Sequence, residues 1–315
     1  MDVEDHDQLD HERYRGGMDG LEAREVAYFV AVAEELNFSR AANRLGIAQP
    51  PLSRAVKQLE RRLGVVLLER TSRRVTLTAA GQVLLNEGRR ALDALAAAAR
   101  RAQRAGQQDP RLVLVTKAVG DGGMLPEILA AYESEPDAIK VDVLFCGFGE
   151  QTVLLRSGVA DVGLLHGRPD LTGLDFEDLL VEHQIAVLPA RHRLAGRAAV
   201  TLADLDGEAM PRFAGMRHDG TEGPEVHDAG QLMQLIAMGR TTAILPESAR
   251  GYLAGDLVCV PVLDAPPSTM MIAWPEQSRS PALATFVRAA TDVAARRRVR
   301  CGPDSGYDGN QLRDS

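Results

Sequence analysis

The feature that most constrains the fold is the run from Phe38 to Arg70, where two short amphipathic helices are separated by a tight turn. We expect Ser39 to cap the first helix, because its hydroxyl can accept a hydrogen bond from a free N–H group of the first turn. Gly46 marks the turn, where the backbone needs a conformation that glycine adopts without strain. The second helix begins at Gln49 and carries Pro50, which a first turn tolerates. This spacing predicts a helix-turn-helix.

The outer side of the second helix carries Ser53, Arg54, Lys57 and Gln58. Arginine and short hydrogen-bonding side chains near the start of such a helix are typical of docking in the major groove of DNA. From the spacing alone, an αα-hairpin with a solvated charged side is the alternative. The following VVLLERTSRRVTLT favours DNA binding, because it predicts two short strands around a basic turn at 72–74, as in a winged helix.

Residues 21–105 resemble the DNA-binding half of LysR-type transcriptional regulators. The resemblance is carried by Phe29 with Val32–Ala33, by FSRAANRLGIAQPPLSRAVKQLERRLGVVLLERT and by RRVTLTAAG. It implies a sequence-specific transcriptional regulator that binds double-stranded operator DNA as a homodimer or a dimer of dimers. RNA polymerase is a further expected partner if the protein is an activator.

The DNA-contacting residues follow from the two helices and the basic turn. We predict that one set faces base edges: Gln49, Pro50, Ser53 and Arg54. A second set is expected to contact backbone phosphates: Ser39, Arg40, Lys57 and Arg73.

The charge is divided unevenly along the chain. Residues 21–105 carry 15 Lys and Arg against 8 Asp and Glu, whereas residues 106–315 carry 19 against 29 and residues 1–20 carry 2 against 7. The overall net charge of −8 therefore hides a basic module on an acidic body. Positive charge gathered in one module favours DNA binding through release of phosphate counterions.

One long helix is predicted from Thr78, a possible cap, to about Arg104. Small and apolar residues recur along it at alternating spacings of four and three, which indicates a coiled-coil-like seam. A helix packed only on its own domain is the alternative, but the resemblance implies that two subunits pair through this linker helix. The seam consists of Leu84, Gly88, Ala91, Leu95, Ala98 and Ala102.

Composition excludes several other classes. No apolar stretch is long enough to span a membrane, and residues 1–20 are too acidic for a signal peptide, so we expect a cytoplasmic protein with a disordered N-terminal tail. Met18 is a candidate natural start. Cys146, Cys259 and Cys301 are widely spaced, so no metal site or disulfide framework is predicted, although a redox pair stays open. We expect no cofactor.

From Arg111 onward, strand-like and helix-like segments alternate, which favours mainly parallel sheets with helices on both faces. This α/β pattern resembles the effector domain of the same family, which has two lobes like periplasmic solute-binding proteins. The chain is expected to cross to the second lobe near Pro189–Leu194 and to return near Met271–Pro275. The last helix is then expected to pack on the first lobe.

Ligand residues are expected beyond the carboxyl ends of the strands. The loop from Lys117 to Gly123 leads into a helix whose free N–H groups can hold an anion, so we predict an anionic small-molecule effector. The glycine-rich segment at 147–149 is expected to open the next helix in the same way. The predicted ligand-binding residues are Lys117, Gly120, Gly147, Phe148, His166, Arg168, Phe213 and Thr241.

The second lobe departs from the family pattern. Only MRHDGTEGPEVH separates Gly215 from the helix that begins near Asp228, where family members usually have a further helix and strand. Gly239-Arg240-Thr241 replaces the common Gly-x-Gly. We therefore expect a shortened second lobe, and a vestigial cleft is an open alternative, with control by a protein partner or by abundance.

Two other classes of protein fit the sequence less well. An enzyme on the two-lobed fold lacks support, because the sequence contains no GxSxG, P-loop or HExxH motif, and no catalytic residues are predicted. An architectural DNA-binding protein is also disfavoured, because the compaction of DNA does not require an acidic two-lobed domain. The predicted organisation is an acidic tail at 1–20, a winged helix-turn-helix at 21–78, a dimerisation helix at 79–105, an effector domain at 111–300 and a tail at 301–315.

Overall fold

The computed structural model describes residues 21–71, 74–106, 109–167, 169–215, 223–253 and 255–300. The chain divides into two compact units, Met1–Ala96 and Ala97–Ser315, which are described separately. The predicted tails at 1–20 and 301–315, with Cys301, lie outside the described residues. In the described part of the chain, no helix is both long and apolar enough to cross a membrane.

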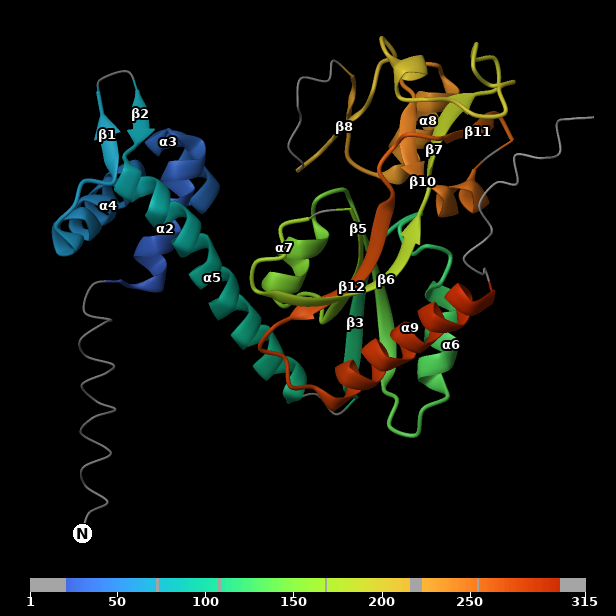
Figure 1. Ribbon diagram of the computed structural model, residues 1–315. Coiled ribbons are helices and arrows are strands. Elements are labelled where there is room, and N and C mark those ends of the chain that lie inside the picture. Colours follow the sequence, from blue (N-terminus) through green and yellow to red (C-terminus); the bar gives the residue numbers. More distant parts are fainter. Residues whose placement is uncertain are drawn as a thin grey trace, which may run out of the picture. The chain divides into compact units, whose positions relative to one another are not determined.

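The first unit contains the predicted helix-turn-helix and hairpin (Figure 1). Its elements are α2 (Ala23–Glu35), α3 (Phe38–Leu45), α4 (Gln49–Leu63), β1 (Leu68–Arg70), β2 (Val75–Leu77) and the start of α5 (Ala79–Ala105). β1 and β2 pair antiparallel, as a wing requires. One apolar core joins the elements, and its fully buried members include Phe29, Val32, Leu52, Val56 and Leu59.

The α3–turn–α4 segment confirms the predicted turn and corrects the predicted cap. Asn37, not Ser39, caps α3: its side-chain oxygen accepts hydrogen bonds from the N–H groups of Ser39 and Arg40 at 2.9 and 3.0 Å. An amide oxygen one residue before the helix therefore replaces the expected hydroxyl. Gly46 ends α3 in the left-handed region with φ 66°, and α4 begins at Gln49 as predicted.

A single carboxylate joins α4 to the wing. Glu60 on α4 accepts hydrogen bonds from the backbone N–H groups of Leu67 and Leu68 at 3.0 and 3.1 Å. Its second oxygen accepts a hydrogen bond from the guanidinium of Arg70 at 2.8 Å. That guanidinium lies over the ring of Phe38, 4.8 Å from its centroid. Glu60 thus holds the entry of the wing against two helices at once.

We expect Glu60→Ala to lower the free energy of unfolding of the first unit by about 2–4 kcal/mol, because three donors lose a charged acceptor. Glu69→Ala, which removes an exposed carboxylate from β1, is the control and should change stability little. Chemical denaturation followed by far-UV circular dichroism measures both. Equal stability of the Glu60 variant and the wild type would contradict the role of this carboxylate.

The long helix α5 begins as predicted but shows a shorter exposed seam. Thr78 caps it, since its hydroxyl accepts a hydrogen bond from the Gly81 N–H at 2.9 Å. Gly88 is buried against α2, where an added Cβ would lie 2.8 Å from Val26, and Leu84 packs on the same core. These two positions therefore belong to the first unit's core. The rest of the predicted seam is exposed: Ala91, Leu95, Ala98 and Ala102.

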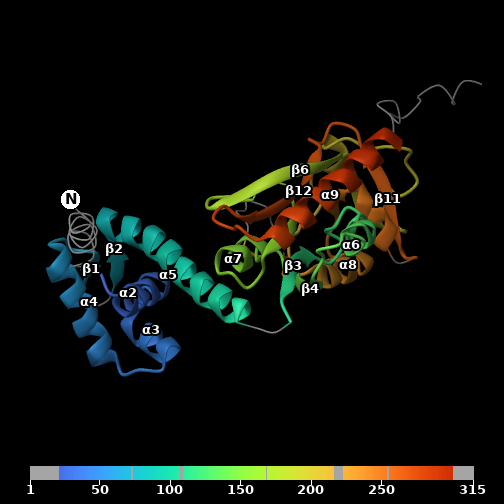
Figure 2. The same ribbon diagram turned by 90° about the horizontal axis from the view of Figure 1, so that it is seen from below.

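The first lobe of the second unit is built on a five-stranded sheet in the order β4-β3-β5-β12-β6. Its strands are β3 (Arg111–Lys117), β4 (Lys140–Cys146), β5 (Val162–His166), β6 (Leu174–Glu182) and β12 (Ser268–Pro275), and its helices are α6 (Leu125–Glu133), α7 (Gln151–Arg156) and α9 (Pro281–Arg300). β3 is parallel to β4 and β5, whereas β12 is antiparallel to both of its neighbours. The last helix packs on this lobe as predicted, and α6 and α9 lie side by side (Figure 2).

The second lobe contains a three-stranded sheet in the order β10-β7-β11. Its elements are β7 (Gln184–Pro189), η1 (Ala203–Leu205), β8 (Arg212–Phe213), β9 (Glu225–Val226), α8 (Ala229–Ala237), β10 (Ala243–Pro246), η2 (Glu247–Tyr252) and β11 (Leu257–Val262). Both partners of β7 are antiparallel, so the expectation of mainly parallel sheets is wrong. Short apolar runs indicate buried strands but not their direction.

The crossing points between the lobes also differ from the prediction. Only His183 separates β6 in the first sheet from β7 in the second, so the chain crosses there and not near Pro189–Leu194. The return falls at 263–267, between β11 and β12, before the predicted Met271–Pro275. β6 lies at the edge of the sheet, and its sequence LDFEDLLVE carries several charges. It lacks the apolar run that indicates a buried strand, so it was not predicted. Most of the shortened connection, 216–222, lies outside the described residues.

Candidate DNA-binding surface and interlobe site

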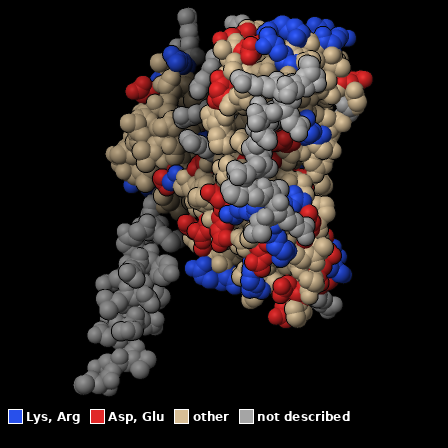
Figure 3. Space-filling model, turned by 45° about the vertical axis from the view of Figure 1, so that its right-hand side comes forward, with Lys and Arg blue, Asp and Glu red and all other residues tan. Residues whose placement is uncertain are grey.

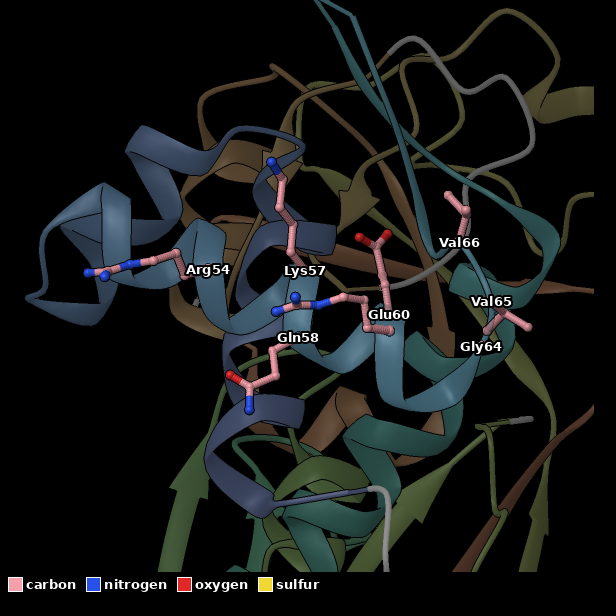
Figure 4. A pocket seen from close by; sticks show the side chains of 8 residues that line it. Arg54, Lys57, Gln58, Glu60, Gly64, Val65 and Val66 are labelled. Carbon is pink, nitrogen blue, oxygen red and sulfur yellow. The ribbon is translucent and has the colours of Figure 1, made fainter.

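The exposed face of α4 carries a group of basic side chains. Arg54, Lys57 and Arg61 are exposed, and within the described residues none of them forms an ion pair. Figure 4 shows Arg54, Lys57 and Gln58 projecting away from the helix. Free guanidinium and ammonium groups on one helix face can contact phosphates and base edges without first breaking an internal pair.

The structure places most of the predicted DNA-contacting residues at the surface. Ser39 and Arg40 at the start of α3, and Gln49 and Pro50 at the start of α4, are exposed, while Ser53 is half-buried. Arg40 is engaged by Glu35, with 3.1 Å between its Nε and the carboxylate oxygen. Arg73, in the wing turn, lies outside the described residues.

Three surface residues beside the predicted set were not expected from the sequence: Arg61, Val65 and Val66. Arg61, Val65 and Val66 line a shallow hollow of about 600 Å³ between α4 and the foot of the wing, together with Arg54 and Lys57. Figure 4 labels all of these residues except Arg61. Arg61 lies seven residues after Arg54, which is the spacing that repeats one helix face, so the signal was present in the sequence. The exposure of Val65 and Val66 could not be predicted from the sequence, because it depends on the path of the chain after Gly64.

In the second unit, an aromatic pair and a cation meet where the lobes touch. Phe148 follows β4 in the first lobe and Phe213 lies on β8 in the second, with ring centroids 4.7 Å apart. The ammonium of Lys117, at the end of β3, lies 5.6 Å from the Phe148 centroid. Burial lowers the pKa of Lys117, and no described acidic residue forms an ion pair with it. The structure therefore brings together three of the predicted ligand-binding residues.

The backbone N–H groups proposed to hold an anion already have acceptors from the protein itself. Near the start of α6, the Asp121 carboxylate accepts hydrogen bonds from the N–H groups of Gly123 and Leu125 at 3.3 and 3.4 Å. The N–H of Gly147 donates to the carboxylate of Glu150 at 2.9 Å. That of Phe148 donates across the lobes to the His227 carbonyl at 2.8 Å. Side-chain cations, above all Lys117, remain the groups suited to an anionic ligand.

A buried polar cluster lies beside Lys117 at the crossing between the lobes. The side chains of His166 and Glu182 are only 6% and 7% exposed, with 3.8 Å between Nδ1 and Oε2. Burial, assisted by the charge of Lys117, lowers the pKa of His166 to about 4, so the imidazole is neutral. Burial raises the pKa of Glu182, whose other oxygen accepts a hydrogen bond from the Ser248 N–H at 2.9 Å.

The remaining predicted ligand-binding residues lie in positions that suit ligand binding less well. Thr241 is buried in the second lobe, where its hydroxyl donates to the Ala209 carbonyl at 2.7 Å. In the register of β10 with β7, Pro246 pairs with Gln184 next to the crossing, so Thr241 lies toward the far end of that lobe. Gly120 closes a tight turn by donating to the Lys117 carbonyl at 3.0 Å. Arg168 lies outside the described residues.

His166 should make the stability of the second unit depend on pH. Its folded pKa of about 4 lies below the unfolded value of 6.5, so the unfolded chain binds more protons between these values. The free energy of unfolding should therefore fall as the pH drops from 6.5 to 4, by roughly 3 kcal/mol from this group. The raised pKa of Glu182 acts in the opposite direction, because its contribution to stability is lost as the pH rises from the unfolded pKa toward the folded one.

We expect His166→Gln to flatten this acid-side decline. Urea denaturation at a series of pH values measures it, and the fluorescence of Trp274, the chain's single tryptophan, reports on the first lobe. Parallel pH profiles for the variant and the wild type would show that His166 does not titrate between the two states.

The two units together define a winged helix-turn-helix DNA-binding module joined to a two-lobed α/β domain. Residues 23–82 match the family described as bacterial regulatory helix-turn-helix protein, lysR family, and residues 105–295 match the LysR substrate binding domain. The second match alone covers more than half of the chain. The protein belongs to the LysR family of transcriptional regulators.

Similar proteins agree with this assignment. The Hca operon transcriptional activator HcaR of Escherichia coli (strain K12) is 30% identical over 285 residues, which cover 85% of this chain and 96% of HcaR. The uncharacterised regulator YnfL of the same strain is 32% identical over 286 residues, covering 84% and 96%. The crystal structure of CbnR, a LysR family transcriptional regulator, matches with a TM-score of 0.54 at 27% identity, covering 87% of this chain and 99% of CbnR.

Proposed function

We propose that this LysR-family regulator recognises its operator through the exposed face of α4. The observation that carries the proposal is a set of three exposed cations that form no ion pair with any described residue: Arg54, Lys57 and Arg61. Arg54, in the second turn of α4, is assigned to a base edge together with Gln49, Pro50 and Ser53. Lys57, Ser39, Arg40 and Arg73 are assigned to phosphates. The relatives are regulators, and we propose that this chain likewise has no enzymatic activity.

Arg54→Ala should cost roughly 1–3 kcal/mol of operator binding and much less on random DNA, because a bidentate base contact discriminates between sequences. Lys57→Ala is the matched comparison and should weaken binding to both DNAs alike, since phosphates carry no sequence information. Fluorescence anisotropy against an operator selected from a random-sequence library measures both. An equal loss on the two DNAs for Arg54→Ala would assign this residue to phosphate instead.

We propose that residues 21–78 form the DNA-binding domain, 79–105 the dimerisation helix and 111–300 the effector domain. Two subunits would pair through the exposed residues Ala91, Leu95, Ala98 and Ala102 of α5. Small side chains allow two helices to approach closely, and Leu95 is 55% exposed in the single chain. Such a dimer places two DNA-reading heads on two half-sites. A protein that binds operator DNA would act in the cytoplasm of a bacterium.

Leu95→Asp should convert the dimer into monomers and weaken operator binding, because the charge enters a seam with no cation to pair with it. Asn86→Asp adds the same charge to an exposed position on the opposite side of α5 and should leave the dimer intact. Sedimentation velocity measures the assembly. A fully dimeric Leu95→Asp variant with normal operator affinity would refute the seam.

We further propose that an anionic metabolite binds where the lobes meet, with Lys117 as its counter-charge and Phe148 and Phe213 beside it. Binding would stabilise one arrangement of the lobes and so change the geometry of the dimer. A ligand from cell extract should raise the melting temperature of the protein by mass action. Lys117→Met should reduce that shift while operator binding in the absence of ligand is retained.

A further inference from the structure

The segment that precedes the DNA-binding module is acidic, although the module itself is basic. Residues 1–20 contain seven acidic residues against two basic ones, which gives this acidic segment a net charge of −5. Val3 and Leu9 place apolar side chains among the carboxylates. The acids are spread along the segment: Asp2, Glu4, Asp5, Asp7, Asp10, Glu12 and Asp19. A run of like charges of this kind is typical of a segment that interacts with an oppositely charged surface.

Such a surface is present on α4. Arg54, Lys57 and Arg61 line the hollow of about 600 Å³ between α4 and the foot of the wing, and they form no ion pair with any described residue. Val65 and Val66 line the same hollow and are 44% and 62% exposed (Figure 4). A concave surface that combines cations with exposed apolar side chains is complementary to an acidic peptide that carries apolar residues.

The acidic segment joins the described structure beside this hollow. Glu22 and Glu25, at the start of α2, both form ion pairs with Arg62 in the last turn of α4, and the Arg62–Glu22 pair is 3.9 Å long. Arg62 directly follows Arg61, which lines the hollow. The chain before Glu22 therefore leaves from the same end of α4, where acids of α2 already neutralise one cation.

The acidic segment is long enough to cover the whole cationic face. Arg54 and Arg61 are seven residues apart on α4, which corresponds to roughly 10 Å along the helix axis. Twenty extended residues span up to about 70 Å. Groups tethered in one chain meet at an effective concentration on the order of millimolar, so that individually weak ion pairs are sufficient for binding.

We propose that residues 1–20 bind the α4 face of their own subunit, with carboxylates on Arg54, Lys57 and Arg61, and so compete with DNA. Carboxylates and phosphates use the same donors, so the acidic segment must leave before DNA occupies these cations. Every DNA sequence then loses affinity by the same factor, because each binds only the fraction of protein whose face is open. This inference rests on the proposal that α4 is the DNA-binding face.

Neutralisation of the acidic segment tests the competition. Full-length protein with all seven acids replaced by their amides should bind operator and random DNA more tightly by the same factor, on the order of tenfold at low salt. The plot of log affinity against log salt should become steeper by up to about three, since three cations then exchange small counterions rather than carboxylates. Fluorescence anisotropy at several salt concentrations measures both quantities.

A control variant of equal net charge separates occupation of the face from a general effect of charge. It replaces seven exposed carboxylates of the second unit by their amides and should bind DNA like the wild type. The replaced residues are Glu133, Asp137, Asp175, Glu177, Asp206, Glu276 and Asp292.

Carbodiimide cross-linking locates the acidic segment in the wild-type protein. Lys57 is the only lysine among residues 1–116, so an amide between the acidic segment and a lysine of the first unit can form only there. Peptide mass spectrometry should find this link, and saturating operator DNA should abolish it. Lys140, exposed on β4 of the second unit, is the internal comparison and should link to residues 1–20 far less.

The two measurements distinguish failure of this inference from failure of the DNA-binding proposal. Equal DNA affinity of the neutralised variant and the wild type would show that the acidic segment does not compete. Tighter binding without a link at Lys57 would mean that the segment repels phosphates from a distance and does not occupy the hollow. A link that persists under saturating operator DNA would place DNA elsewhere and overturn the assignment of α4 as well.

Discussion

The DNA-binding half depends on the carboxylate of Glu60. Three donors at the foot of the wing converge on this one side chain, and the cation among them, Arg70, also covers Phe38 at the start of α3. The recognition helix, the wing and the first helix of the motif are therefore fixed to one another. The residues proposed to face bases and those proposed to contact phosphates are thus carried by elements that share one set of contacts, which suits the reading of a defined DNA register.

Carboxylates play a comparable part in the regulatory half. Asp121 and Glu182 of the first lobe both hold η2 of the second, through Tyr252 and Ser248. A third, Asp161, binds Arg104 near the end of α5 at 2.6 Å and accepts the N–H of Val113 on β3 at 2.9 Å. Carboxylates of the first lobe therefore contact both η2 of the second lobe and the end of α5.

The sequence predicted the helix-turn-helix, the wing strands and most strands of the second unit, because local periodicity determines these elements. The sequence did not predict the features that tertiary contacts determine. The antiparallel sheet of the second lobe, the crossing at His183 and the burial of Thr241 all depend on which strands pair. Asp121 shows the same limit, since no local pattern indicates that a side chain occupies the helix N-terminus expected to hold a ligand.

The pattern of ion pairs distinguishes arginines that build the fold from arginines that are available to DNA. Arg44 and Arg89 both bind Glu34, on helices that pack together, and Arg40 binds Glu35. On α4, Arg54 and Arg61 have no such partner within the described residues. A phosphate must displace Glu35 to reach Arg40, but it meets no competitor at Arg54 or Arg61. Acidic and basic side chains are intermingled over much of the face of the body beyond α5 that Figure 3 shows. Among the described residues, Arg54 and Arg61 of α4 are left without internal ion pairs, and this feature, more than the net charge, supports the proposal that DNA binds this face of α4.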